Sequence, residues 1–185
     1  MCRYKRLLIQ TFGLEIWPLK KPLQIALQDI LRINVDFLSD MPVPASAYNH
    51  KRSQFLAEKF LEILVLKKTF DSDMVLGIVD VDLYEPGLNF VFGLASYEIG
   101  VGIISLKRLS NTFYGLENNE ELYFKRVLTE AVHEIGHILG LPHCPDVKCV
   151  MHFSNSIADT DRKSYHFCKN CQEKASKVLC MDDFI

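Results

Sequence analysis

The sequence predicts an α+β fold built around a mixed β-sheet, with an α/β arrangement as the alternative. Segments in which apolar and polar residues alternate are interleaved with segments in which apolar residues recur every three or four positions, so strands and helices follow one another along the chain. The length of 185 residues suits a single domain. The 49% of hydrophobic and 24% of charged residues are ordinary for a globular protein and exclude wholesale disorder.

The first part of the chain predicts two strands and two helices. Residues 5–12 are an apolar stretch typical of a strand. Pro22 opens a helical pattern, because proline is well tolerated in the first turn of a helix. Residues 33–38 alternate and predict a second strand, and residues 39–53 carry the proline, asparagine and aspartate of a loop. Residues 54–68 predict a long helix, too apolar on several sides to lie in solvent.

The middle of the chain returns to the period of a strand. Residues 75–84 predict a third strand, whose second half places Asp80 and Asp82 on the solvent face. Pro and Gly then mark a turn, and residues 90–95 and 101–106 predict two strands joined as a hairpin.

A long helix is predicted after Asn118. Together with Glu121, three residues later, Asn118 resembles the capping box that begins many helices. Apolar residues continue at helical spacing up to Gly140, and Pro142 follows, which is the usual end of a helix. Beyond this point we expect a loop and one short final helix near residues 170–178.

Charge and hydropathy exclude several classes of protein. A formal net charge of -2 argues against a protein built to coat nucleic acid or an anionic membrane. No apolar run reaches the roughly 18 residues of a membrane span. The first 17 residues lack a long apolar region and a cleavage site, so we expect a first strand and not a signal peptide. We therefore expect a cytoplasmic protein with neither nucleic acid nor a membrane as its partner.

The segment His-Glu-Ile-Gly-His within the long helix has the spacing of metal ligands. His133 and His137 are four residues apart, so they lie on one face of the helix, where two neutral imidazoles can bind one zinc. Gly140 permits the turn that brings His143 as a third ligand, which leaves a fourth position open, as in catalytic zinc sites. Glu134 is rotated by roughly 100° from His133, where it reaches a water held by the metal.

Two alternative roles for this segment stay open. The histidines can be ordinary polar groups on an amphipathic helix, or they can bind zinc without performing chemistry. In the second case the protein would be a non-catalytic peptide-binding or scaffold protein with two zinc ions.

The cysteines are unevenly distributed, with Cys2 alone and five in the last 42 residues. This distribution argues against a disulfide framework that staples the whole chain. Four of them form C-x4-C and C-x-x-C pairs, which together supply the four thiolates of a closed structural zinc site. These four are Cys144, Cys149, Cys168 and Cys171. Disulfides, free thiols or iron are the alternatives, and Cys2 and Cys180 are expected to be ordinary thiols.

The whole motif resembles a known family. H-E-x-x-H-x-x-G-x-x-H followed by a methionine is the metzincin signature of zinc peptidases. A cysteine directly after the third histidine, then C-x4-C-x-M and a later C-x-x-C, is similar to the archaemetzincins in particular. The motifs cover residues 133–171, about a fifth of the chain. The resemblance implies a metzincin-like zincin fold, with Met151 as the Met-turn methionine packed beneath the zinc ligands.

The resemblance also implies an organisation and an activity. One catalytic domain, residues 1–185, would divide into an N-terminal subdomain (1–140) with the sheet and zinc helix, and a C-terminal subdomain (141–185) with the Met-turn and the four-cysteine site. The protein would be a zinc metallopeptidase that hydrolyses peptide bonds through a water held by zinc and activated by Glu134, with a second, structural zinc. We expect a monomer that binds a peptide or protein substrate in extended conformation along the hairpin of residues 90–106.

Other polar residues give weaker signals. Arg126 is predicted to be a solvated charge on the helix surface. His152 and Asn155 follow Met151 closely enough to line the cleft, and Tyr165 and His166 are candidates for assisting an oxyanion.

Overall fold

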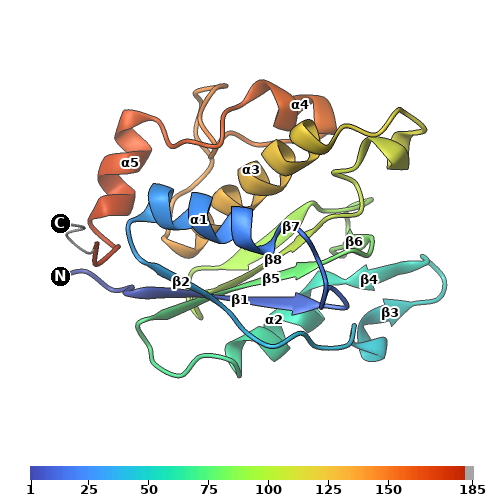
Figure 1. Ribbon diagram of the computed structural model, residues 1–185, viewed down its shortest axis with the longest axis horizontal. Coiled ribbons are helices and arrows are strands. Elements are labelled where there is room, and N and C mark those ends of the chain that lie inside the picture. The colour runs from blue at the N-terminus through green and yellow to red at the C-terminus, as the bar shows by residue number, and fades with distance from the viewer. Residues whose placement is uncertain (182–185) are drawn as a thin grey trace.

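Five strands form the central sheet of the computed structural model, which describes residues 1–181 (Figure 1). Their order is β2-β1-β5-β8-β7; the first four run parallel and β7 is antiparallel to β8 at one edge. The bounds are β1 Arg6–Phe12, β2 Asn34–Phe37, β5 Asp73–Val79, β7 Gly93–Ser96 and β8 Val101–Ser105. The inner strands β5 and β8 are buried at every position, as expected of parallel strands covered on both faces.

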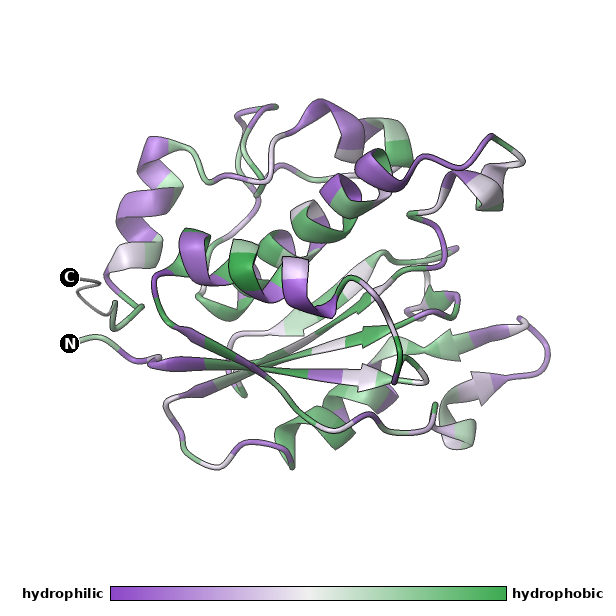
Figure 2. Cartoon of the chain, in the orientation of Figure 1, coloured by the Kyte–Doolittle hydropathy of each residue, from purple (hydrophilic) through white to green (hydrophobic). Residues whose placement is uncertain are grey.

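Helices cover both faces of this sheet (Figure 1). α1 (Lys20–Leu31) and α3 (Glu120–Ile138) lie on one face and α2 (Ala57–Val65) lies on the other. Each face has its own apolar core, the larger beneath α1 and α3 and the smaller beneath α2. Figure 2 shows hydrophobic residues concentrated in the central strands, whereas α5 (Lys169–Ser176) at the surface is largely hydrophilic. This is the mixed-sheet α+β architecture that the sequence predicts.

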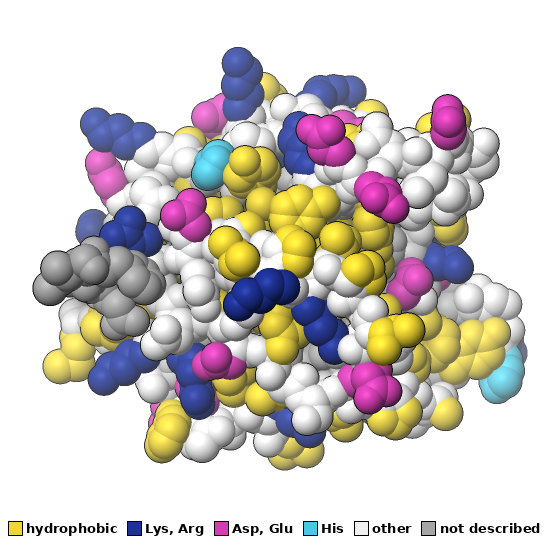
Figure 3. All heavy atoms as spheres, in the orientation of Figure 1, with side chains coloured by type: hydrophobic (Ala, Val, Ile, Leu, Met, Phe, Trp, Pro, Cys, Tyr) yellow, Lys and Arg dark blue, Asp and Glu magenta, His cyan; other side chains and the backbone are white. Residues whose placement is uncertain are grey.

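The remaining elements are short. A second sheet has the order β3-β4-β6, with β3 Tyr48–Asn49, β4 Gln54–Leu56 and β6 Leu83–Tyr84. Two 3-10 helices, η1 (Ala45–Ala47) and η2 (Asn111–Tyr114), and the helix α4 (Ile157–Arg162) complete the structure. Charged side chains of both signs are interspersed over the face of the molecule in Figure 3.

The predicted helix over residues 54–68 is wrong in its first turn. The first three of these residues form strand β4, and α2 begins only at Ala57. The cause is distant in sequence: the Phe55 N–H donates to the Asp82 carbonyl at 2.8 Å, and the Gln54 amide donates to the Asp82 carboxylate at 3.0 Å. The preceding segment, predicted as loop, accordingly contains η1 and β3.

The predicted strand over residues 75–84 is also too long, because β5 ends at Val79. Asp82 does not lie on the solvent face of a strand. It accepts two hydrogen bonds from the Arg108 guanidinium, at 2.7 and 2.8 Å. This ion pair joins the loop after β5 to the segment after β8.

The helices differ from the sequence prediction in three details. The cap of α3 is Asn119, whose side chain accepts from the Leu122 N–H, and not Asn118. The helix α4 was not expected from the sequence, and it starts with a capping box formed by Ser156 and Asp159. Arg126 is 5% exposed and not solvated: it donates to the Asp161 carboxylate, with two bonds of 2.8 Å.

The two ends of the described chain lie side by side (Figure 1). Tyr4 forms a parallel bridge with Leu179, and the Cys180 N–H donates to the Tyr4 carbonyl at 2.7 Å. Cys2 and Cys180 form a disulfide with their Cα atoms 5.0 Å apart. The expectation that these two cysteines are ordinary thiols is therefore wrong. Their proximity follows from the isolated bridge between Tyr4 and Leu179. The bonded cysteines are 178 positions apart in sequence, which no local pattern indicates.

Candidate metal centre and active site

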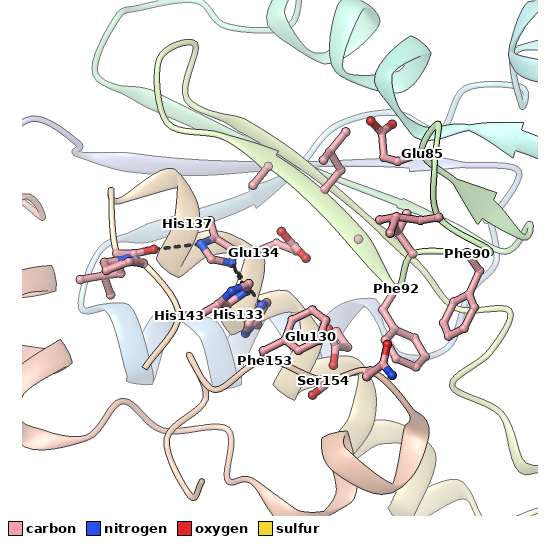
Figure 4. A pocket seen from close by; sticks show the side chains of 18 of the residues that line it. Glu85, Phe90, Phe92, Glu130, His133, Glu134, His137, His143, Phe153 and Ser154 are labelled. Carbon is pink, nitrogen blue, oxygen red and sulfur yellow. Dashed lines mark hydrogen bonds between the residues drawn. The ribbon is translucent and has the colours of Figure 1, made fainter. Parts of the chain in front are cut away.

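Three histidine rings meet at the C-terminal end of α3 (Figure 4). The His137 Nε2 lies 3.2 Å from the Nε2 of His133 and 3.2 Å from that of His143. The other nitrogens of the two helical rings contact backbone carbonyls, His133 Nδ1 that of Val150 at 2.7 Å and His137 Nδ1 that of Leu141 at 2.8 Å. Because Nδ1 has a carbonyl acceptor, the Nδ1–H tautomer is favoured and each Nε2 lone pair is left facing the others.

This arrangement fits a zinc ion. Nitrogens about 2.0–2.1 Å from a tetrahedral zinc are separated by roughly 3.3–3.4 Å, close to the observed spacing. Without a metal ion between them, the lone pairs of three unprotonated Nε2 atoms that face one another would repel. The carbonyl partners also match the usual surroundings of a zinc-binding histidine, whose second nitrogen donates to an oxygen.

Electrostatics keeps the three rings neutral. Burial is the largest influence and lowers the pKa of His133 well below its usual value, and nearby Lys163 and His137 lower it further. Burial likewise lowers the pKa of His137 and of His143. A neutral imidazole is the form that binds metal, so these residues do not need to lose a proton to do so at neutral pH.

The end of α3 delivers the third ring. Gly140 has φ +88°, a left-handed conformation that favours glycine, and the Leu141 N–H donates to the Gly136 carbonyl at 2.9 Å. The chain therefore reverses within two residues of the helix end, and His143 comes back over the helical histidines. The turn expected at Gly140 is confirmed.

Met151 packs against α3 at Gly136, between the two helical histidines. It is fully buried, and its sulfur lies against Gly136, where any larger side chain would collide with it. The Met151 carbonyl accepts from the Cys144 N–H at 2.9 Å, which fixes the segment of chain that carries His143. The role of Met151 as a Met-turn methionine, which the family resemblance implies, stays a prediction.

Glu134 lies beside the histidines in the cleft (Figure 4). It is 5% exposed, and burial, with a further contribution from the neighbouring carboxyl of Glu130, raises the pKa of Glu134 well above its usual value. The charge of Lys163 opposes this rise. A carboxylate of raised pKa is a better proton acceptor at neutral pH.

The four cysteines of the two pairs form a second cluster, with one sulfur from each within 4.8 Å of the others. The Sγ atoms of Cys144 and Cys168 are 3.9 Å apart, whereas a disulfide requires about 2.05 Å. Sulfurs about 2.3 Å from a tetrahedral zinc are separated by roughly 3.8 Å. The Cys149 sulfur also accepts from the N–H groups of Met151 and Cys168, as is favourable for a thiolate. The cluster fits a closed zinc site.

A cleft of 1110 Å³ runs past the histidines. The edge strand β7 forms one wall, and α3 with the segment after it forms the other. Figure 4 shows Phe90, Phe92 and Phe153 on one side of the histidines, with Glu85 across the strand. Asn155 lines the cleft, as expected from its place shortly after Met151.

Three of the weaker predictions are wrong. His152 does not line the cleft, because its Nδ1 contacts the Cys144 carbonyl at 2.8 Å. Tyr165 and His166 also lie outside the cleft lining, in the segment just before Cys168, so neither is placed to assist an oxyanion.

Sequence reasoning missed two buried charges next to the site. Lys163 is 1% exposed and Glu130 is 2% exposed. Burial lowers the pKa of Lys163, and the carboxyls of Glu130 and Glu134 oppose that fall. Glu130 occurs one turn before Glu134, a spacing that places both on one helix face and offered a signal. Lys163 stands in a polar stretch where no pattern distinguishes it.

Comparison with known proteins gives a consistent result. The model of peptidase family M54 matches residues 10–177. Archaemetzincin from Pyrococcus furiosus is 48% identical over 150 residues, 80% of this chain and 78% of that protein. Archaemetzincin from Pyrococcus horikoshii is 52% identical over 134 residues, 72% of this chain and 71% of that protein.

Solved structures are similar over nearly the whole fold. The archaemetzincin of Methanopyrus kandleri superposes with a TM-score of 0.81 at 36% identity, covering 94% of both chains. A zinc-dependent peptidase from Methanocorpusculum labreanum superposes with a TM-score of 0.83 at 30% identity, covering 91% of this chain and 99% of that one.

Proposed function

The chain belongs to peptidase family M54, the archaemetzincins, and is a zinc metallopeptidase; from this premise we propose that three histidines hold its catalytic zinc and that Glu134 is its general base. The proposed ligands are His133, His137 and His143. One observation carries the proposal: three Nε2 atoms with neighbours at 3.2 Å face one point, beside a buried carboxyl of raised pKa.

The chemistry divides between the metal and the protein. When bound, zinc polarises the scissile carbonyl and makes a water more acidic. Glu134 takes the proton of the attacking water at its carboxylate and passes it to the nitrogen of the leaving amine. The Val150 and Leu141 carbonyls hold the two helical imidazoles in orientation through their Nδ1–H groups.

The substrate is proposed to bind as an added strand. Within the described chain, β7 pairs with β8 along one side only, so its other side presents backbone groups to the cleft. An extended peptide placed antiparallel to β7 would bring its backbone past the histidines, with few side chains read directly. Residues 90–106, predicted from the sequence as the substrate hairpin, contain this edge.

A second, structural zinc is proposed for the four cysteines. His143 and Cys144 are adjacent, so closing the cysteine site would fix the loop that presents the third histidine. The Cys144 N–H donates to the Met151 carbonyl, and the Cys144 carbonyl contacts the His152 ring. These two contacts connect the cysteine site to the histidine site through the Met-turn. The expected composition is two zinc ions per chain.

We also propose a cytoplasmic monomer that acts on peptides or proteins, without nucleic acid or a membrane as partner. The net charge of -2 and the mixed charges in Figure 3 support the exclusion of nucleic acid. Within the part of the chain that the structure describes, no helix has the length and apolar character to cross a membrane. The disulfide of Cys2 and Cys180 fits a cytoplasm in which disulfides persist, as in hyperthermophiles.

Metal analysis combined with hydrolysis of a peptide library tests the proposal. The purified protein should carry two zinc equivalents and cleave extended peptides. A chelator should abolish cleavage by removing the three-histidine zinc first, because the four-thiolate site is closed. A zinc-loaded protein that binds peptides from the library and cleaves none would instead be a non-catalytic binding module.

A further inference from the structure

The buried ammonium group of Lys163 contacts both the turn after Met151 and the helix α3 that carries two of the proposed zinc ligands. Lys163 follows α4 directly, and its side chain is 1% exposed. Its Nζ donates to the carbonyl of His152 at 2.9 Å and lies 3.2 Å from the Nδ1 of His133. The same group therefore contacts the turn that follows Met151 and the back of a proposed zinc ligand on α3.

Two buried carboxyls on α3 act electrostatically on this ammonium. Glu130 and Glu134 stand one turn apart on α3, and both interact electrostatically with Lys163. Thr160 on α4 donates from its hydroxyl to the Glu130 Oε1 at 2.9 Å. Among the described residues, Lys163 is the sole lysine in the buried set. The Thr160–Glu130 hydrogen bond and the contacts of Lys163 with His152 and His133 thus link α4 and the Met-turn to the helix that carries the histidines.

Stability alone does not account for this arrangement. Removing charges from water is costly, and well-packed apolar residues often replace a buried ion pair without loss of stability. An ammonium at this place differs from an apolar side chain in what it contacts. It holds the His152 carbonyl, and it lies at the nitrogen through which His133 is oriented. The Nδ1–H of His133 already donates to the Val150 carbonyl, so Lys163 acts on the ring through the neighbouring chain and not as a hydrogen-bond acceptor. Residues outside the ligand set that orient a zinc-binding histidine commonly alter metal affinity or activity by about 10–100-fold.

We propose that Lys163 is a positioning residue of the zinc centre, which fixes the His133 ring relative to the Glu134 carboxylate by holding the turn at His152 against α3. This inference rests on the proposed roles of His133 and Glu134. Those residues are adjacent in sequence, so a shift of the turn behind His133 changes the distance between metal and base. A misplacement of about 1 Å at such a site can cost roughly 100-fold in rate.

The test uses the zinc-loaded full-length protein and separates positioning from stability. Lys163→Met replaces the ammonium with an apolar group of similar length. Glu130→Leu removes one buried carboxyl, and the double variant removes both charges. Lys174→Met, at an exposed position of α5, is the matched control. For each protein the melting temperature, zinc content, kcat, KM and the NMR signal of the His133 Nδ1–H proton are measured.

If Lys163 positions the zinc centre, melting temperature and kcat should respond differently to these substitutions. Lys163→Met should lower the melting temperature by roughly 10 °C, because it leaves buried carboxyls without their cation. The double variant should recover most of that loss. Its kcat should nevertheless stay about 10–100-fold below that of Glu130→Leu, with KM little changed, and its His133 ring proton should stay shifted or exchange faster.

Two results would overturn the inference. One is a double variant whose kcat matches that of Glu130→Leu once stability is recovered. The other is a His133 ring proton unchanged from wild type in Lys163→Met and in the double variant. The NMR signal needs zinc but no turnover, so it reports on Lys163 even if the wild type cleaves no peptide, a result that would count against the proposed function instead.

Discussion

Gly93 on β7 lies directly against Glu134 on α3, so closely that a methyl group on Gly93 would stand 2.7 Å from both the Cγ and the Oε1 of the glutamate. Real side chains do not approach so closely. The absence of a side chain at Gly93 therefore lets the edge strand and the proposed general base meet at the floor of the cleft. The same Cβ would stand 2.7 Å from the Ile103 carbonyl of β8, so the strand has little room to retreat.

Gly93→Ala should therefore displace Glu134 and lower kcat by roughly 100-fold, the usual result of about 1 Å of misplacement at a catalytic group. Zinc content should stay at the wild-type value, because the histidines are not touched. Gly102→Ala on β8 is the control, since its Cβ meets Ala95 and the Leu94 carbonyl at 3.2 Å without approaching Glu134. Equal losses of kcat in both variants would show that sheet packing, and not Glu134, is responsible.

Gly136→Ala should destabilise the protein by about 1–3 kcal/mol, the typical result of overpacking a core. The added methyl group collides with the Met151 sulfur, which is fully buried. Urea unfolding measures the change. Because Met151 also holds the segment with His143, the chelator-sensitive zinc should dissociate faster. A variant with wild-type stability would show that Met151 does not pack as described.

Cys168→Ser and Cys171→Ser should each lose the tightly held zinc equivalent and lower the melting temperature before any effect on chemistry is seen. A structural zinc contributes its binding energy to folding, and serine does not replace a thiolate ligand. Elemental analysis and thermal denaturation measure both effects. If zinc content and melting temperature are unchanged in both variants, these cysteines are not ligands.

Cys2→Ser should lower the free energy of unfolding by about 2–4 kcal/mol, since the disulfide restricts a chain whose ends are far apart in sequence. Both zinc equivalents should remain, because neither cysteine belongs to the metal clusters. Unfolding of the wild type with and without reductant gives the same comparison. A reductant effect that persists in Cys2→Ser would come from other cysteines.

Acid should remove the contribution of Asp73 to stability. Burial alone would raise the pKa of Asp73, but hydrogen bonds from Arg6 and from the Phe70 and Thr69 N–H groups outweigh it and hold the pKa below its usual value. The folded protein thus binds this proton less readily than the unfolded chain. The contribution is complete well above pH 4 and declines as the pH falls through the folded pKa. The difference in unfolding free energy between wild type and Asp73→Asn should accordingly shrink below about pH 4. A constant difference down to pH 2 would contradict the assignment.

Local patterns predicted much of the fold and the clusters of the site. The four-residue spacing of His133 and His137, the turn at Gly140 and the cysteine pairs each depend on neighbours in sequence, and the structure brings these residues together. The strand β4 could not be found in this way, because its partner Asp82 is 28 residues from Gln54. Tertiary pairing decided against the helical propensity of that segment.

The burial of Arg126 and Lys163 could not be predicted from the sequence either. Arg126 is enclosed by α4 and by the segment after β8, where it donates to the Leu109 carbonyl, and Lys163 is enclosed where α4 packs onto α3. The disulfide of Cys2 and Cys180 depends on the bridge between Tyr4 and Leu179, which joins the two ends of the described chain. Such features arise from contacts across the whole chain, which periodicity does not report.

The role of Glu134 as general base is tested most directly by comparing wild type with Glu134→Ala, both loaded with zinc, in a steady-state peptide cleavage assay with parallel zinc analysis. We predict two zinc equivalents in both proteins, retained substrate binding, and a kcat lower by about 10²–10⁴ in the variant, because a positioned acid–base group has been removed while the histidines remain. A variant that cleaves at the wild-type rate would contradict the role of Glu134, and one that loses zinc would place Glu134 on the metal instead.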